Sequence, residues 1–369
     1  MRTRRQVAAM SVLVAACVAT GSATAGDLID TVTTAKPRAA LSAYLEKPAA
    51  AAASKRSFGR AIALHQALVV ARGPASPEAR ALATLWTLAG QPEEAARVLT
   101  AFADATADAA AATAARAEAA RLTAKPDPFA RQLELPTLAA EAKTAFKQGR
   151  AAFAKKQWGD ALVSYQMGYA LAPELPGFLR ELGATYDKLG ATDKKLEFYR
   201  AYLLRRPFGK NADAVRAELS KDPKALGALV LTTSLPCDEL WLNRQRVPGA
   251  PTGKPLAVAP GAYKALCLSR KYEIAIFEYA TVTAGATETL RFDWAIVVNQ
   301  LTNPYGRIAI ENPKHPGELL DLGVSSPEVG VVVPGDGRPL RLIVKDDTGS
   351  RADERSVRIK PGERYVVKW

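Results

Sequence analysis

The sequence predicts a multidomain chain, with all-α helical repeats at the N-terminus followed by two small all-β modules. Near Gly227, alanine-rich helical sequence gives way to short β-branched runs separated by Pro and Gly, which are typical of strands and turns. Residues 306–369 repeat the order of these runs. In the helical part a pattern recurs with the 34-residue period of a two-helix unit: Gly149, Tyr165 and Pro173 return as Gly183, Tyr199 and Pro207.

Residues 1–25 are predicted to be a secretion signal. Arg2, Arg4 and Arg5 precede an apolar stretch, and the small residues Ala23-Thr24-Ala25 form a cleavage site before Gly26. The remaining chain is long enough for several domains of roughly 100–200 residues each. Its hydrophobic content of 48% is sufficient to build their cores.

A second processing route starts from the same segment. Val14-Ala15-Ala16-Cys17 resembles the lipobox at which bacterial lipoproteins are cleaved and then acylated on the cysteine. Cleavage at Ala25 and lipidation of Cys17 both place the protein in the periplasm or cell envelope, and lipidation adds anchoring to the inner or outer membrane. No later window holds the roughly 18 consecutive apolar residues of a membrane-spanning helix, so we expect no transmembrane segment in the mature chain.

The chain is strongly basic, with a formal net charge of +13. The signal carries three arginines and no acid, so the mature chain keeps a charge of +10. Outside the inner membrane the available polyanions are lipid headgroups, acidic glycans and acidic proteins, so we expect no nucleic-acid partner. The alternative is a diffuse charge that serves solubility.

Residues 142–226 are predicted to hold a repeat pair and a capping helix, from Asn211 to Leu219. The segment from Ala142 to Pro173 resembles a tetratricopeptide repeat, and the next unit matches that family better still. Lys195 and Gly168 depart from the pattern by replacing alanines of the second helices, which predicts looser or shifted packing there. The matching residues are Gly149, Phe153, Trp158, Ala161, Leu162, Tyr165 and Pro173, then Leu182-Gly183, Tyr186, Leu189-Gly190, Tyr199 and Pro207.

Residues 26–125 are predicted to contain degenerate repeats of the same kind. Ala61 lies 34 residues before Ala95, and residues 103–122 are favourable for helix but offer little to bury, which indicates a solvated helix or a mobile spacer. Residues 126–141 are predicted to be a linker because prolines interrupt the helical pattern. The upstream matches to the repeat are Leu82, Trp86, Ala89-Gly90, Glu93-Glu94-Ala95, Leu99 and Phe102, and the linker prolines are Pro126, Pro128 and Pro136.

The β-rich part is divided into residues 227–295, a linker at 296–305, and residues 306–369. The first module resembles a PEGA domain, a small sandwich-like fold, although its Pro-Glu-Gly-Ala tetrad is not intact. The second module repeats the plan less closely, with Trp294 and Trp369 as equivalent ends. The resemblance rests on Leu231 to Pro236, Leu240 to Asn243 and Pro260 to Tyr263.

The sequence predicts no enzyme, cofactor or metal site. His65 and His315 are the only histidines and lie in different domains, and phosphate-binding Gly loops and the G-x-S-x-G elbow are absent. Asp346-Asp347 is interpreted as a solvated turn, with calcium binding as the weaker alternative. An enzyme of unrecognised type remains the least favoured function.

Cys237 and Cys267 are the only cysteines after cleavage at Ala25, and an oxidising compartment favours a disulfide between them. In the chain-entropy model a loop of this size stabilises the fold by about 3–4 kcal/mol. A redox role would need a closely spaced C-x-x-C pair, which the sequence lacks. We therefore expect a structural bond within the first β-module.

The tetratricopeptide resemblance implies a scaffold or adaptor that binds a protein partner in the groove lined by its first helices. A basic groove suits an acidic or extended segment, although these positions are equally compatible with solvated helix faces and the two phenylalanines with burial between helices. The alternative function is binding of peptidoglycan or surface polysaccharide through exposed Trp241 and Tyr263 of the PEGA-like module. The groove residues are Lys143, Phe146, Arg150, Phe153, Arg180 and Lys188.

Overall fold

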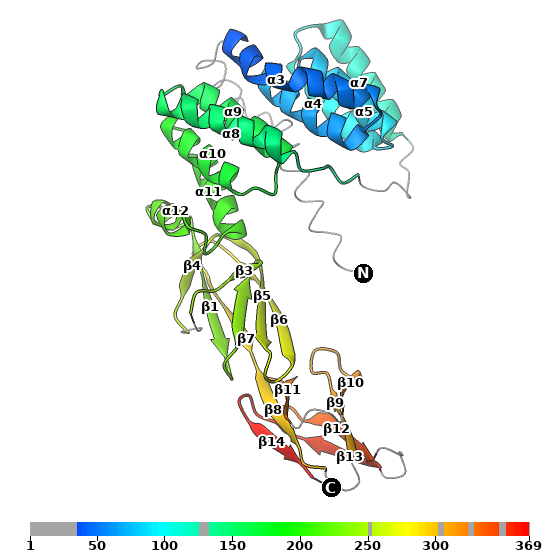
Figure 1. Ribbon diagram of the computed structural model, residues 1–369, viewed down its shortest axis with the longest axis vertical. Coiled ribbons are helices and arrows are strands. Elements are labelled where there is room, and N and C mark those ends of the chain that lie inside the picture. The colour runs from blue at the N-terminus through cyan, green and yellow to red at the C-terminus, as the bar shows by residue number, and fades with distance from the viewer. Residues whose placement is uncertain are drawn as a thin grey trace. The chain divides into compact units, whose positions relative to one another are not determined.

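The computed structural model divides the chain into two units, Met1–Phe198 and Tyr199–Trp369. The first is helical and the second is rich in strands (Figure 1). Cys17, the cleavage site at Ala25 and Asp347 lie outside the described residues. The structure describes residues 35–124, 133–249, 253–301, 306–323, 328–346 and 352–368.

The described part of the first unit consists of helices that pair into hairpins. α3 packs against α4, α5 against α6 and α8 against α9, while α4 also packs against α9. The central position of α4 and α9 explains why both bury apolar residues around most of their circumference. The helices are α3 (Ala35–Ser54), α4 (Phe58–Arg72), α5 (Pro77–Leu88), α6 (Pro92–Ala105), α7 (Ala109–Thr123), α8 (Ala139–Ala154), α9 (Trp158–Leu171), α10 (Gly177–Lys188) and α11 (Thr192–Arg205).

The same turn joins four consecutive pairs of helices: α3 to α4, α5 to α6, α8 to α9 and α10 to α11. Its left-handed residue is Arg56, Gly90, Lys156 or Gly190, with φ between 54° and 75°. In each turn the following N–H donates to the carbonyl five residues earlier, at 2.9–3.0 Å, which is the Schellman pattern of a helix C-terminus. Arg56 and Gly90 are 34 residues apart, as are Lys156 and Gly190. The 34-residue period is therefore present in both halves of the helical unit, and the two halves are offset by 100 residues.

Glycine at position 168 tightens the packing instead of loosening it. The ring of Phe178 lies where a Cβ on this residue would project, and Phe178 is only 3% exposed. Gly149 admits the ring of Tyr165 in the same way. The other departure, Lys195, places its ammonium 2.8 Å from Asp187 Oδ1. The expectation of loose packing at Gly168 is wrong, because an aromatic ring replaces the missing methyl group.

The segment expected to be a solvated helix or mobile spacer forms α7, which packs against α6. The Asp108 side chain caps its start by accepting hydrogen bonds from two backbone N–H groups at 2.9 and 3.0 Å. Ala112, Ala115 and Ala119 are buried along one face. A stripe of alanine methyl groups is thus sufficient to pack α7 against α6, because these small side chains allow the two helices to approach closely.

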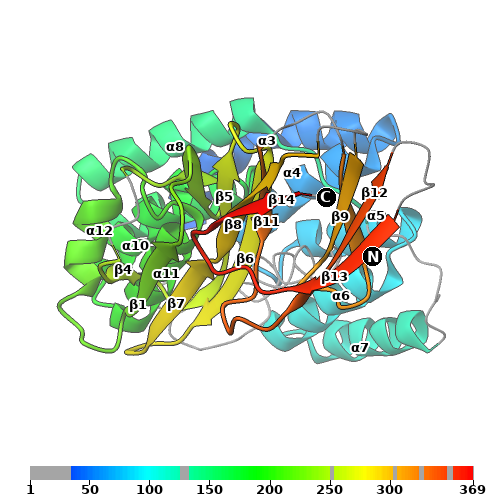
Figure 2. The ribbon, with the colours of Figure 1, turned by 90° about the horizontal axis from the view of Figure 1, so that it is seen from below.

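The two β-modules have the same topology in the same strand order. In each, the second, third, fifth and sixth strands make an antiparallel sheet, ordered β3-β2-β5-β6 and β10-β9-β12-β13. The first strand pairs antiparallel with the fourth and parallel with the seventh, giving β4-β1-β7 and β11-β8-β14 (Figure 2). The two β-rich segments therefore repeat one strand order.

The strands of the first module are β1 (Gly227–Thr233), β2 (Glu239–Leu242), β3 (Gln245–Arg246), β4 (Leu256–Val258), β5 (Gly261–Ser269), β6 (Ile274–Val282) and β7 (Thr287–Phe292). Those of the second are β8 (Trp294–Asn299), β9 (Gly306–Glu311), β10 (Leu319–Gly323), β11 (Glu328–Val332), β12 (Leu340–Asp346), β13 (Ala352–Val357) and β14 (Arg364–Val367).

The boundary between the modules differs from the prediction. Residues 296–299, assigned to a linker, form most of β8, the central strand of its sheet. Trp294 begins the second module instead of ending the first. Trp369, its expected equivalent, lies outside the described residues. Residues 302–305 of the expected linker lie outside the described residues.

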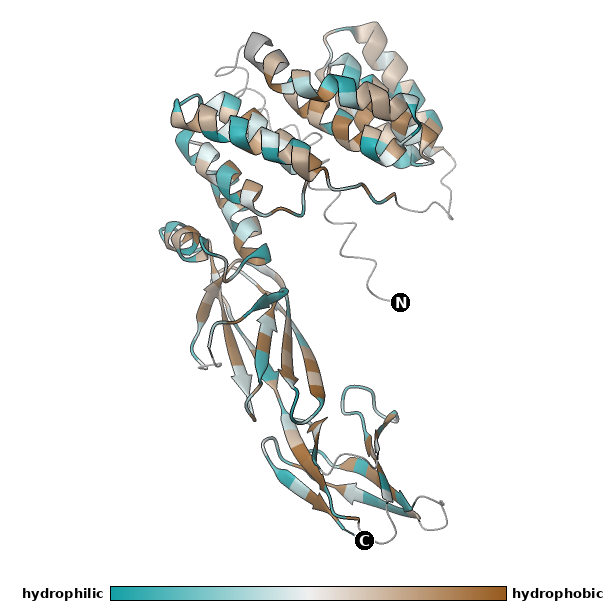
Figure 3. Cartoon of the chain, viewed as in Figure 1, coloured by the Kyte–Doolittle hydropathy of each residue, from teal (hydrophilic) through white to brown (hydrophobic). Residues whose placement is uncertain are grey.

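Strand β8 contributes to the cores of both modules. Trp294 and Ile296 are buried in the core of the first module, while Ala295 and Val297 are buried in that of the second. Figure 3 shows the mainly hydrophobic colouring that follows from this double burial. Because one strand is covered on both faces, the two modules share a packed interface.

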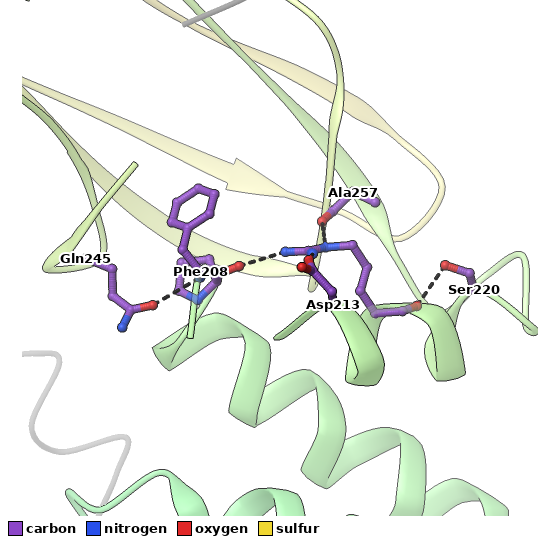
Figure 4. A network of polar contacts seen from close by, with 7 residues as sticks. Phe208, Asp213, Ser220, Gln245 and Ala257 are labelled. Carbon is purple, nitrogen blue, oxygen red and sulfur yellow. Dashed lines mark hydrogen bonds and ion pairs between the residues drawn. The ribbon is translucent and has the colours of Figure 1, made fainter. Parts of the chain in front are cut away.

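A short helix, α12 (Ala212–Leu219), lies against the first β-module. Arg216 Nε donates to the carbonyl of Ala257 at 2.9 Å and its Nη2 to that of Pro207 at 2.7 Å (Figure 4). The Phe208 N–H donates to Gln245 Oε1 at 3.0 Å. α12 was expected to cap the last repeat. Its hydrogen bond to another element, among the described residues, runs from Arg216 to Ala257 of β4.

Candidate functional site

The predicted groove residues come from two neighbouring first helices. Lys143 and Arg150 of α8 and Lys188 of α10 are exposed, while Arg180 is half-buried. The remaining two, Phe146 and Phe153, are also half-buried. α8 therefore carries exposed cations and half-buried aromatic side chains.

Phe146 is the aromatic residue that connects the helices. Its ring centroid lies 5.8 Å from that of Tyr165 and 5.5 Å from that of Phe178. Phe153 instead packs edge-on against Trp158 at 4.8 Å, beside the hairpin turn. Phe146 is half-buried and packs against rings of α9 and α10.

Three cations form what we call the α8 cationic face: Lys143, Lys147 and Arg150. Their spacing of four and three residues places them on one side of the helix, and all three are exposed. Within the described part of the chain, no carboxylate lies within ion-pair distance of any of them. Lys147 was missed in the sequence, although its position four residues after Lys143 was a usable signal.

The cations of α10, unlike those of α8, have acidic neighbours on their own helix. Arg180 forms an ion pair with Glu181, and Lys188 Nζ lies 4.0 Å from Asp187 Oδ2. Their charge is at least partly neutralised within the helix. The α8 cationic face is consequently the stronger candidate for binding an anion.

A buried tyrosine lies beneath these helices. Burial raises the pKa of the Tyr165 phenol well above its usual range, and the carboxylate of Glu181 raises it further. The nearby charges of Arg150 and Arg180 oppose this shift. Tyr165 is therefore a neutral phenol, and Arg150 and Arg180 approach it from two helices.

The first half of the helical unit lacks most of the cations of the α8 cationic face and also lacks the aromatic residue beside them. Of the three cations, only Lys147 has a cationic counterpart 100 residues earlier, which is Lys47. The position of Phe146 is taken by Glu46, which is paired with Arg72. The counterparts of Lys143 and Arg150 are Ala43 and Ala50. The same helical hairpin forms without two of the cations and without the aromatic residue, so the fold does not require them.

The residues expected to contact a glycan lie on opposite faces of their sheet. Tyr263 is 1% exposed, and its hydroxyl donates to the carbonyl of Ala259 at 2.7 Å. Trp241 is half-buried on the outer face. Tyr263 is therefore a core residue, and the expectation of exposure was wrong for it because β5 turns this side chain inward together with Cys267.

The disulfide between Cys237 and Cys267 is confirmed. Cys267 is fully buried in the core of the first module, and Cys237 is partly buried beside it. The bond joins the segment before β2 to β5 across 30 residues of sequence. Its burial agrees with a structural role.

A depression of about 360 Å³ lies where the two modules meet, lined by residues of both. Four of its charged residues are paired: Lys314 Nζ lies 2.6 Å from Glu278 Oε1, and Arg291 lies 3.4 Å from Asp293 Oδ1. Among the described residues, no group of three or more His, Cys, Asp or Glu side chains is placed to hold a metal ion. No helix in the described ranges combines the length and apolar character needed to span a membrane.

No family description matches this chain, and no curated protein matches it. Solved structures of MamA align with about half of it. A crystal structure of MamA is 16% identical and covers 47% of this chain and 94% of its own, with a TM-score of 0.18. The MamA MSR-1 C2 structure is 14% identical and covers 48% and 97%, with a TM-score of 0.16. At these TM-scores the likeness carries no argument about function.

Proposed function

We propose that the chain is an exported, non-enzymatic scaffold of the cell envelope that binds an extended acidic segment of a protein partner across α8. The α8 cationic face carries this proposal. Lys143, Lys147 and Arg150 form a row of exposed charges without described acidic partners, next to the half-buried ring of Phe146. Charge-assisted hydrogen bonds from such a row suit carboxylates that follow one another along a peptide.

The β-modules have a mechanical part in this proposal. Strand β8 supplies side chains to both cores, so the two modules are joined by packed apolar side chains. The arrangement supports a rigid spacer, because bending at this junction would expose Trp294 and its neighbours to water. The PEGA resemblance of the modules remains a prediction from the sequence.

The binding proposal predicts that a triple variant, Lys143→Ala, Lys147→Ala and Arg150→Ala, weakens binding of an acidic peptide by about tenfold or more. Loss of a charge-assisted hydrogen bond costs about 1.5–3 kcal/mol, and even at an exposed surface three together should exceed the 1.4 kcal/mol of a tenfold change. The measurement is fluorescence anisotropy of a labelled deca-glutamate peptide with the full chain.

A matched control removes the same charge from other exposed positions of the helical unit: Lys47→Ala, Lys55→Ala and Arg121→Ala. These three cations likewise have no acidic partner in the described residues. The control should leave peptide affinity nearly unchanged. If both triple variants weaken binding equally, net charge alone attracts the peptide and α8 is not the site.

Export is a separate prediction, tested by the intact mass of the chain recovered from the periplasm or envelope. A mass that starts at Gly26 corresponds to cleavage at Ala25, and a mass that starts at an acylated Cys17 corresponds to lipidation. Either result supports export. A chain that retains Met1 and remains in the cytoplasm contradicts it.

A further inference from the structure

The outer face of the sheet β3-β2-β5-β6 carries a row of side chains that runs across all four strands. The register pairs Arg246 with Trp241, Trp241 with Leu266, and Leu266 with Phe277. In the next row on the same face, Lys264 is paired with Tyr279. We call this set the aromatic face: Trp241, Lys264, Leu266, Phe277 and Tyr279, with Arg246 at its edge.

Much of this aromatic surface is open to solvent. Phe277 is 42% exposed and Tyr279 is 66% exposed, the largest exposed fraction among the large hydrophobic residues described. An antiparallel sheet with one solvated face is ordinarily polar on that side. The core of the module already occupies the opposite face, through Tyr263 and its neighbours. Exposed aromatic residues gathered on the second face therefore indicate a binding surface.

The duplicated module shows that the fold does not require these residues. β13 occupies in the second module the place of β6 in the first, and its residues opposite the outer face of β12 are Ala352, Glu354 and Ser356. Lys345 of β12 is exposed there without an aromatic neighbour across the strand. The same topology thus forms without aromatic side chains at these positions.

The charge of the aromatic face is positive. The Lys264 ammonium lies 4.2 Å from the ring centroid of Phe277 and 5.6 Å from that of Tyr279. The nearest acid on β2, Glu239, accepts hydrogen bonds from the Trp241 indole at 3.0 Å and from Arg270 at 2.7 Å. No described carboxylate lies within ion-pair distance of Lys264 or Arg246. The carboxylate of Glu239 interacts with Arg246 from further away, and its ion pair is with Arg270. An anionic ligand would therefore complement the surface.

We propose that the aromatic face binds an acidic polysaccharide chain. A sugar ring stacks the face that carries its C–H bonds against a flat aromatic side chain. The carboxylate or phosphate groups of the polysaccharide would pair with Lys264 and Arg246. The surface is open to an extended ligand, because Phe277 and Tyr279 are 42% and 66% exposed. Addition of a peptide strand at the edge of β6 is disfavoured, since the Phe277 carbonyl already accepts a hydrogen bond from Lys314 at 2.6 Å.

The proposal is independent of peptide binding by α8. Its test is isothermal titration of the full chain with oligogalacturonate and with the uncharged methyl ester of the same oligosaccharide. Alginate, hyaluronate and solubilised peptidoglycan serve as further acidic probes. Phe277→Ala and Tyr279→Ala should each weaken binding at least fivefold for both forms of the sugar, because stacking does not depend on the charge. Lys264→Ala should weaken only the acidic form.

Lys345→Ala is the matched control, since it removes an exposed lysine from the equivalent strand of the second module. It should leave affinity unchanged. Equal losses in Lys264→Ala and Lys345→Ala would show non-specific charge and overturn the proposal. It is also overturned if no acidic polysaccharide binds, if the aromatic variants keep full affinity, or if the wild-type chain dimerises through this face and the variants do not.

Discussion

Trp294→Ala is expected to lower the free energy of unfolding of the β-modules by about 3–5 kcal/mol, the range measured for removal of a large buried aromatic side chain. Trp294 is fully buried. Its indole N–H donates to the carbonyl of Leu235 at 3.1 Å and lies 3.3 Å from Thr233 Oγ1. Removal leaves a cavity and breaks the hydrogen bond to the Leu235 carbonyl. Urea unfolding followed by circular dichroism in the β region measures the loss.

The position of Trp294 on β8 gives this variant a second signature. Because β8 lies in both cores, amide exchange should accelerate in β5 of the first module and in β12 of the second. Trp294→Phe is the control, since it keeps most of the volume and should lose clearly less stability. Acceleration confined to one module would contradict the shared core.

Removal of the disulfide, by Cys237→Ala together with Cys267→Ala, is expected to destabilise the first module by about 3–4 kcal/mol in the chain-entropy model. The bond closes 30 residues of sequence around β2 and β5, and without it the unfolded chain gains conformational freedom. The check is the urea midpoint of the variant against that of the oxidised wild-type chain. The helical signal should unfold at its original midpoint, which serves as an internal control. An unchanged midpoint for the β signal would contradict a structural role.

The helical repeats were predictable because their packing uses small and large residues at fixed positions. Gly149 and Tyr165 illustrate this, since the ring of the tyrosine occupies the space that the glycine leaves free. The effect of Gly168 was not predictable in the same way. Its partner, Phe178, belongs to the next hairpin, so the sequence around the glycine does not reveal which ring fills the gap.

The strand that joins the modules was missed for a physical reason. A strand buried on one face shows alternating polarity, but β8 is buried on both and shows none. The polar residues after it favoured a linker. Only Asp293 separates β8 from β7, so the sequence contains no run of turn or loop residues that would mark the boundary between them.

Part of the aromatic face could be predicted from the alternation of inward and outward side chains along each strand. Cys267 points into the core, and Tyr263 lies four residues earlier on the same strand, so it points inward too. Phe277 and Tyr279 alternate with buried Ile274 and Ile276, which indicates the outer side. What the sequence did not contain was the register that places Trp241, Leu266 and Phe277 in one row.

The central claim, that α8 binds a protein partner in the cell envelope, is tested most directly by photo-crosslinking in living cells. A photoreactive amino acid is introduced at position 147, or at position 121 as the control, and crosslinked products are identified by mass spectrometry. The account predicts a reproducible partner at position 147, crosslinked through an acidic segment, and its loss in the Lys143→Ala and Arg150→Ala background. The same products at both positions, or none at position 147, would contradict it.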